Sequence, residues 1–167
     1  MVSAGLKQSA SKEEFIKALG MNALNPTDNA ILKEMWEEVT VYWNKHFETP
    51  TDRKILKPEY AGNDKIQKPY KWAHLDPAFI DQSIAEVWQA ARPGPRHYYE
   101  LGRSEDRKVF NWVLKWLLWH VCRYRDWRNR KAKPTPLTVK PVLSTTVTAP
   151  AESSTLPPRD YWTTVLN

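Results

Sequence analysis

The densest group of chemically useful side chains is a run of cationic residues near position 130. It contains Arg123, Arg125, Arg128, Arg130, Lys131 and Lys133, with Tyr124, Trp127 and Asn129 between them. Cations that neutralise phosphates release counterions, which gives affinity for nucleic acid without sequence preference. Aromatic rings and guanidinium planes also stack on exposed bases. The run, with Trp127 as its stacking residue, predicts contact with a nucleic acid, with DNA favoured over RNA.

The excess positive charge of the chain is concentrated around this run. The net charge of the whole chain is +6, and residues 103–133 alone hold 10 basic and 3 acidic side chains, a net charge of +7. Two other interpretations stay open. Cations are favourable at a helix C-terminus because of the helix dipole, so the run can be a solvated helix end. The sequence from Arg128 to Lys133 also has the composition of a nuclear-import signal.

A second basic set, mixed with aromatic residues, lies within the Pro-punctuated stretch 49–75. Its members are Lys54, Lys57, Lys65, Lys68 and Lys71, near Tyr60, Tyr70 and Trp72, and the acidic residues Asp52, Glu59 and Asp64 dilute its charge. A lysine-rich surface strap held by buried aromatic rings is the favoured interpretation. If the two sets face the same way, they form one continuous basic surface, and Lys68 and Lys71 join the predicted phosphate ligands.

Side chains for catalysis or metal binding do not form a recognisable group. The only cysteine is Cys122, so neither an internal disulfide nor a thiolate cluster for zinc is available. His120 is two residues from Cys122, and neighbours two apart on a helix point in different directions. Glu34 and Glu38 share a helix face, but no nearby residue completes a site, and solvated surface is the better interpretation. We therefore expect a non-enzymatic protein with no cofactor and no metal.

A different class of function is indicated by the tryptophan content and by the end of the sequence. The chain has 9 Trp, a residue enriched at binding surfaces. Residues 161–166 are mostly apolar, and Tyr161, Trp162, Val165 and Leu166 are the candidate partner-binding side chains. The alternative to nucleic-acid binding is thus a protein–protein interaction or self-association domain of a larger modular protein, with a homo-dimer as one form.

Helix start and stop signals predict four helices. Ser11 with Glu14 fits a capping box, and the helix that follows ends at Gly20. A second helix begins near Asn25 and Pro26 and runs to about Phe47. A third begins at Asp76 and Pro77 and ends before Arg92, where prolines follow. A fourth begins at Ser104 and runs to about Lys131, roughly 40 Å at 1.5 Å per residue.

The fourth helix is expected to be the centre of the fold. From Val109 to Cys122 it is apolar almost all round, and past Tyr124 it becomes strongly basic. It should be one continuous rod, buried where its neighbours surround it and cationic where it emerges. The predicted fold is all-α: a four-helix orthogonal array or bundle with a long central C-terminal helix, spanning residues 11–133 with a long loop at 49–75.

The flanking regions lack signals for packed structure. Residues 1–10 are expected to be disordered, and residues 134–160 form a flexible, disordered Pro/Ser/Thr-rich linker. Residues 161–167 are a short apolar docking segment or the start of a further region. No secretion signal and no stretch long enough to span a bilayer is present, and a membrane-interface helix is disfavoured because it would lose its core position. We expect a protein inside the cell, in the nucleus or elsewhere, with no membrane partner.

Overall fold

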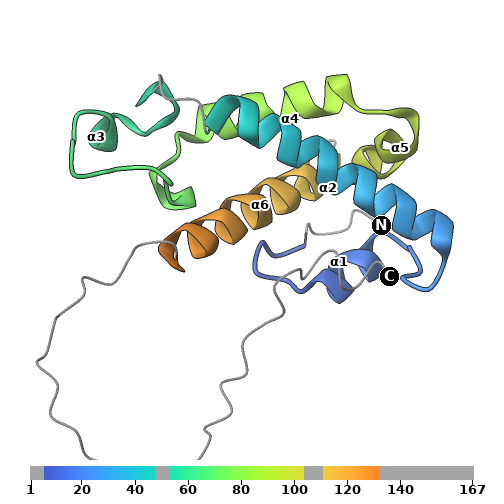
Figure 1. The fold of residues 1–167 in the computed structure, drawn as a ribbon. Coiled ribbons are helices and arrows are strands. Elements are labelled where there is room, and N and C mark those ends of the chain that lie inside the picture. The colour runs from blue at the N-terminus through green and yellow to red at the C-terminus, as the bar shows by residue number, and fades with distance from the viewer. Residues whose placement is uncertain (1–5, 48–52, 104–110, 132–167) are drawn as a thin grey trace, which may run out of the picture. The chain divides into compact units, whose positions relative to one another are not determined.

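The computed structural model describes residues 6–47, 53–103 and 111–131, with side chains as far as residue 124 in the last range (Figure 1). Within these ranges the chain forms six α-helices and two short 3-10 helices, and its only β pairing is two isolated bridges. The all-α prediction is therefore confirmed, but the described helices number six rather than four. The described ranges all belong to one compact unit.

The first helix, α1 (Lys12–Ala18), begins and ends as predicted. The Ser11 hydroxyl accepts a hydrogen bond from the Glu14 amide at 3.2 Å, and the Glu14 carboxylate accepts one from the Ser11 amide at 2.7 Å. This reciprocal pair is the capping box. Gly20 follows the helix with a φ of +70°, a left-handed conformation that favours glycine and turns the chain away.

The second helix, α2 (Pro26–Phe47), has the amphipathic face that the sequence predicts. The Asn25 side chain accepts a hydrogen bond from the Thr27 amide at 2.9 Å at its start. The buried residues recur at three- and four-residue steps: Leu32, Met35, Val39, Trp43 and Phe47. This stripe faces the core.

The next two long helices follow each other closely. In α4 (Pro77–Ala90), the Asp76 side chain caps the start by accepting from the Ala78 amide at 2.8 Å. The following helix, α5 (Pro93–Leu101), is not among the four predicted helices, because its Pro-Gly-Pro sequence is typical of a stop signal. Proline is nevertheless compatible with the first helical turn, where the backbone amide has no partner within the helix. The helix therefore starts inside the proline segment.

The last helix, α6 (Trp112–Lys131), begins later than expected. The predicted start at Ser104 lies outside the described residues; the described helix begins at Trp112, and Asn111 before it pairs with Arg103 in an isolated bridge. The buried Asn111 side chain accepts from the Leu114 amide at 3.1 Å and donates to the Tyr99 carbonyl at 2.6 Å. A capping side chain of this kind marks a helix start. The continuous rod is thus shorter, about 30 Å over its 20 residues.

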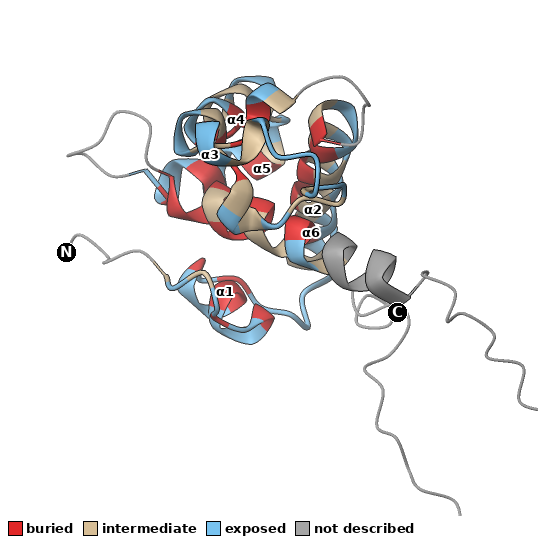
Figure 2. Cartoon of the chain, turned by 90° about the vertical axis from the view of Figure 1, so that its left-hand side faces the viewer, coloured by how far each residue is buried: buried red, intermediate tan, exposed pale blue. Residues whose placement is uncertain are grey.

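The central position of α6 is confirmed. Its residues Val113, Leu114, Trp116, Leu117, Leu118 and Val121 are each at most 2% exposed. It packs against α2, α4 and α5, and Figure 2 shows the buried residues gathered where these helices face one another. On its remaining side, the Trp116 ring stacks on Phe15 of α1. Among the described helices, none is both long enough and apolar enough to cross a membrane.

Candidate functional site

The basic end of α6 continues the buried helix without a break. The backbone is helical from Trp112 to Lys131, so it passes Tyr124 as predicted. Arg123 is exposed, and its guanidinium lies over the Trp119 ring, 5.0 Å from the ring centre. Burial lowers the pKa of His120 to about 4, so this histidine is neutral at pH 7 and adds no charge beside Arg123. The positive charge at this end therefore comes from arginine and lysine.

The segment after α2 is more ordered than the predicted long loop. Residues 53–75 contain a 3-10 turn η1 (Arg53–Ile55), a short helix α3 (Pro58–Ala61) and a second 3-10 turn η2 (Trp72–His74). Leu56 and Leu75 form an isolated bridge, and the backbone amide of Lys57 donates to the His74 carbonyl at 2.9 Å. The two ends of the segment are thus joined. We call residues 53–75 the closed loop.

Arg53 fixes the tip of the closed loop. Its guanidinium lies 2.7 Å from the Asp64 carboxylate and donates to the carbonyls of Asn63 and Ile66, both at 2.8 Å. Arg53 and Asp64 therefore balance each other's charge. Of the other acidic residues that dilute the loop's positive charge, Glu59 is exposed, and Asp52 lies outside the described residues. Apart from this pair, the set holds five lysines against the two carboxylates of Asp52 and Glu59.

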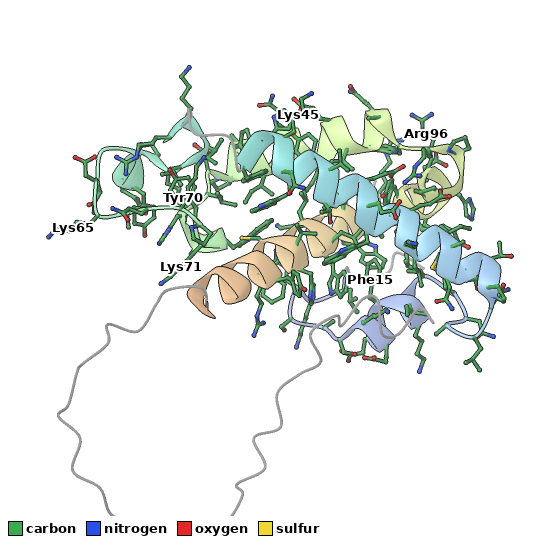
Figure 3. All side chains as sticks on the ribbon, in the orientation of Figure 1. Phe15, Lys45, Lys65, Tyr70, Lys71 and Arg96 are labelled. Carbon is green, nitrogen blue, oxygen red and sulfur yellow. The ribbon has the colours of Figure 1, made fainter. Side chains whose placement is uncertain are left out.

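The closed loop packs against α6. The Cys122 thiol lies 3.7 Å from the backbone oxygen of Tyr70, to which it donates, and η2 contacts α6. In Figure 3, Tyr70 and Lys71 lie beside the C-terminal half of α6, and Lys65 lies farther out on the same side. Cys122 is the residue directly before Arg123, so the packing brings the backbone of Tyr70, between Lys68 and Lys71 in the sequence, against the turn of α6 that leads into the arginine run.

The loop residues combine exposed cations with partly exposed rings. Lys65, Lys68 and Lys71 are exposed, whereas Tyr70 and Trp72 are half-buried. The Lys68 ammonium lies 6.0 Å from the centre of the Tyr70 ring. The two rings are partly buried, in line with the surface-strap interpretation, and they still leave ring surface in contact with solvent.

The predicted site residues divide into three groups. Arg123, Lys68 and Lys71 are exposed and lie within two residues of the Tyr70–Cys122 contact in the sequence. A second group lies on the helical backbone of α6 beyond the last described side chain: Arg125, Trp127, Arg128, Arg130 and Lys131. The third group lies outside the described residues: Lys133, Tyr161, Trp162, Val165 and Leu166.

One polar cluster is missed by reasoning from the sequence. Glu38 is predicted to be solvated, but its side chain is only 13% exposed. It accepts hydrogen bonds from the backbone amide and the Nε of Arg92, both at 2.9 Å, and from the Tyr99 hydroxyl at 2.9 Å. Burial and the Glu38 carboxylate raise the pKa of Tyr99. The cluster ties α2 to the start of α5, and its bond lengths and partners are those of a structural network.

Metal-binding geometry is not found in the described part of the chain. No group of three or more His, Cys, Asp or Glu side chains is placed there to hold an ion. The His120 ring lies tilted against that of Trp116, with 3.8 Å between ring centres, and Cys122 is buried against the closed loop. Comparison of the chain with protein-family models, with curated proteins and with solved structures finds no significant match.

Proposed function

We propose that the protein is a non-enzymatic nucleic-acid-binding module, and that its contact surface is formed by the basic end of α6 together with the lysines of the closed loop. It acts inside the cell, and the nucleus is the favoured compartment. DNA is favoured over RNA as the ligand. The observation that supports the proposal most strongly is the 3.7 Å contact between Cys122 and Tyr70. It joins the backbone at Tyr70, between Lys68 and Lys71 in the sequence, to the residue of α6 that precedes Arg123.

The chemistry of this surface suits a phosphate backbone. Arginine forks and lysine ammonium groups contact phosphates, and several such contacts in a row follow a polyanion. Partly exposed rings among the cations, such as Tyr70, provide a surface on which a base can stack. Because the cations need no base-specific geometry for this, we expect affinity that falls steeply with salt and depends little on sequence.

The proposal is tested by replacing Arg125, Arg128 and Arg130 together by alanine. On duplex DNA, log affinity falls with log salt, and each phosphate contact contributes about −0.9 to this slope. The triple variant should therefore have a slope that is less negative by about 3. Affinity at low salt should fall at least about tenfold. Fluorescence anisotropy of labelled duplex and single-stranded DNA and RNA, each at two salt concentrations, measures both quantities.

A matched control distinguishes the loss of the proposed site from a general loss of positive charge. Lys7, Lys17 and Lys33 are exposed and lie outside both basic sets, and replacing all three by alanine removes the same three charges. This control should keep nearly all of the affinity. An unchanged affinity and salt slope in the arginine variant contradicts the proposal, as does an equal loss in the lysine control.

A further inference from the structure

The surface between α2 and α4 is hollowed by a groove of about 610 Å³, which lies apart from the basic surface. Val87 and Ala90 of α4 and Val41 and Tyr42 of α2 form its apolar part. Two polar pairs in its lining are formed within the chain, since the Tyr42 hydroxyl donates to Glu86 at 2.8 Å and Glu38 is held by Arg92. An apolar group that enters the groove therefore leaves these polar atoms satisfied.

The rim of this groove is an exposed stripe along α2. Glu37, Val41 and Lys45 all line the groove and all are exposed. Val41 is 66% exposed, which makes it one of three large hydrophobic side chains that stand mainly in solvent in the described ranges. Figure 3 shows Lys45 at the upper edge of α2, on the side away from α6.

The charges of the stripe are arranged symmetrically about Val41. Residues four apart on a helix lie on one ridge, and the rise of 1.5 Å per residue places Glu37 and Lys45 about 6 Å before and after Val41. If a second α2 lies antiparallel across the first, with a two-fold axis at Val41, Glu37 faces the partner's Lys45. By the same symmetry Lys45 faces the partner's Glu37. The stripe is therefore complementary to itself, which is the requirement for a two-fold interface.

From this complementarity we infer that the α2–α4 groove is a homodimer interface, whose occupant is a second copy of this chain. Packing of four-residue ridges against each other is a common way for helices to meet. In such a pair, the two Val41 side chains meet at the two-fold axis, beside the Val87 and Ala90 that line each copy's groove. The two Glu37–Lys45 pairs lie at the rim, where they set the antiparallel direction and exclude the parallel one.

The environment of Glu37 fits this role. Arg92 lies 3.9 Å from the Glu37 carboxylate but only 2.9 Å from that of Glu38, so Glu38 is its closer partner. The Glu37 side chain remains 51% exposed. A partner's ammonium group can therefore approach it without breaking the Arg92–Glu38 pair.

Charge reversal tests the inference with the full chain and without nucleic acid. In a dimer of either Glu37→Lys or Lys45→Glu, like charges face each other at both ends of the interface. Each variant should therefore dimerise at least about tenfold more weakly than the natural protein. Mixing E37K with K45E again places opposite charges across both ends of the pair, and should restore dimers. The double variant E37K/K45E should also dimerise. Sedimentation velocity at low salt, up to about 1 mM protein so that a weak dimer is detected, measures each case.

A variant of the apolar contact completes the test. Val41→Asp, which changes an exposed position and should leave the thermal unfolding temperature nearly unchanged, should abolish the dimer. A natural protein that stays monomeric over the whole concentration range overturns the inference. Dimers that form equally well in V41D, or single reversals that mixing does not rescue, show a different interface and overturn it as well. Neither result affects the nucleic-acid proposal, because the groove and the basic surface share no residue.

Discussion

Replacing Trp116 by alanine is expected to lower the free energy of unfolding by about 3–5 kcal/mol. Trp116 is 1% exposed, and its ring stacks on Phe15 with 3.9 Å between ring centres and 11° between planes. Its indole N–H donates to the Ala10 carbonyl at 3.2 Å. The substitution therefore removes a large buried side chain, an aromatic contact and a hydrogen bond that join α6 to the N-terminal segment.

Chemical denaturation of two tryptophan variants measures this difference. Trp119→Ala is the matched control, since Trp119 lies about one turn along the same helix but is half-buried, with Arg123 over its ring. Its loss should cost only about 1 kcal/mol. A domain of this size has about 5–15 kcal/mol of stability in total, so the Trp116 variant should unfold at a clearly lower denaturant concentration. Equal costs for the two variants would contradict the position of α6 at the centre of the fold.

Replacing Gly102 by alanine is expected to destabilise the protein by about 1–3 kcal/mol or more, through overpacking. A Cβ at this buried position would meet the Asn111 side-chain oxygen and would lie 2.7 Å from Cγ2 of Val113. The Asn111 side chain cannot move aside easily, because it is held by hydrogen bonds to Tyr99 and Leu114. The backbone between α5 and α6 must shift instead.

Gly62→Ala is the control for this substitution. Gly62 and Gly102 both follow a short helix with ordinary right-handed φ values, of −87° and −80°. Nothing lies within 4 Å of a Cβ built at Gly62. The control should be neutral, or more stable by about 0.4–1 kcal/mol because alanine restricts the unfolded chain. Thermal unfolding compares the two. A neutral Gly102→Ala would mean that α5 and the start of α6 are not packed as described.

Elements with local capping signals could be predicted from the sequence, whereas those fixed by distant contacts could not. Ser11 and Asp76 cap α1 and α4 with their own side chains, so the signal lies at the start of each helix itself. The start of α6 depends on Asn111, whose amide group reaches the Tyr99 carbonyl twelve residues away. In the sequence, Asn111 looks like an ordinary polar residue in an apolar run, and Ser104 offers the stronger local pattern.

The candidate site also has one part that could be predicted from the sequence and one part that could not. The charge run of α6 and its continuation past Tyr124 followed from composition and helix pattern. The position of the lysine set did not, because it depends on the contact between Tyr70 and Cys122, which are 52 residues apart. The closed loop lacks helical periodicity, and the contacts of Arg53 with residues 63–66 order its tip. Such contacts leave no pattern in the sequence.

Hydrogen–deuterium exchange with and without a DNA duplex tests most directly whether the two basic sets form one surface. Amides of residues 63–72 and of residues 120–131 should both exchange more slowly when DNA is bound, while those of the α2–α4 groove should not change. Protection should disappear from both segments together at high salt, because the contacts are ionic. Protection of only one segment, or of neither, would contradict the single basic surface that the Tyr70–Cys122 contact supports.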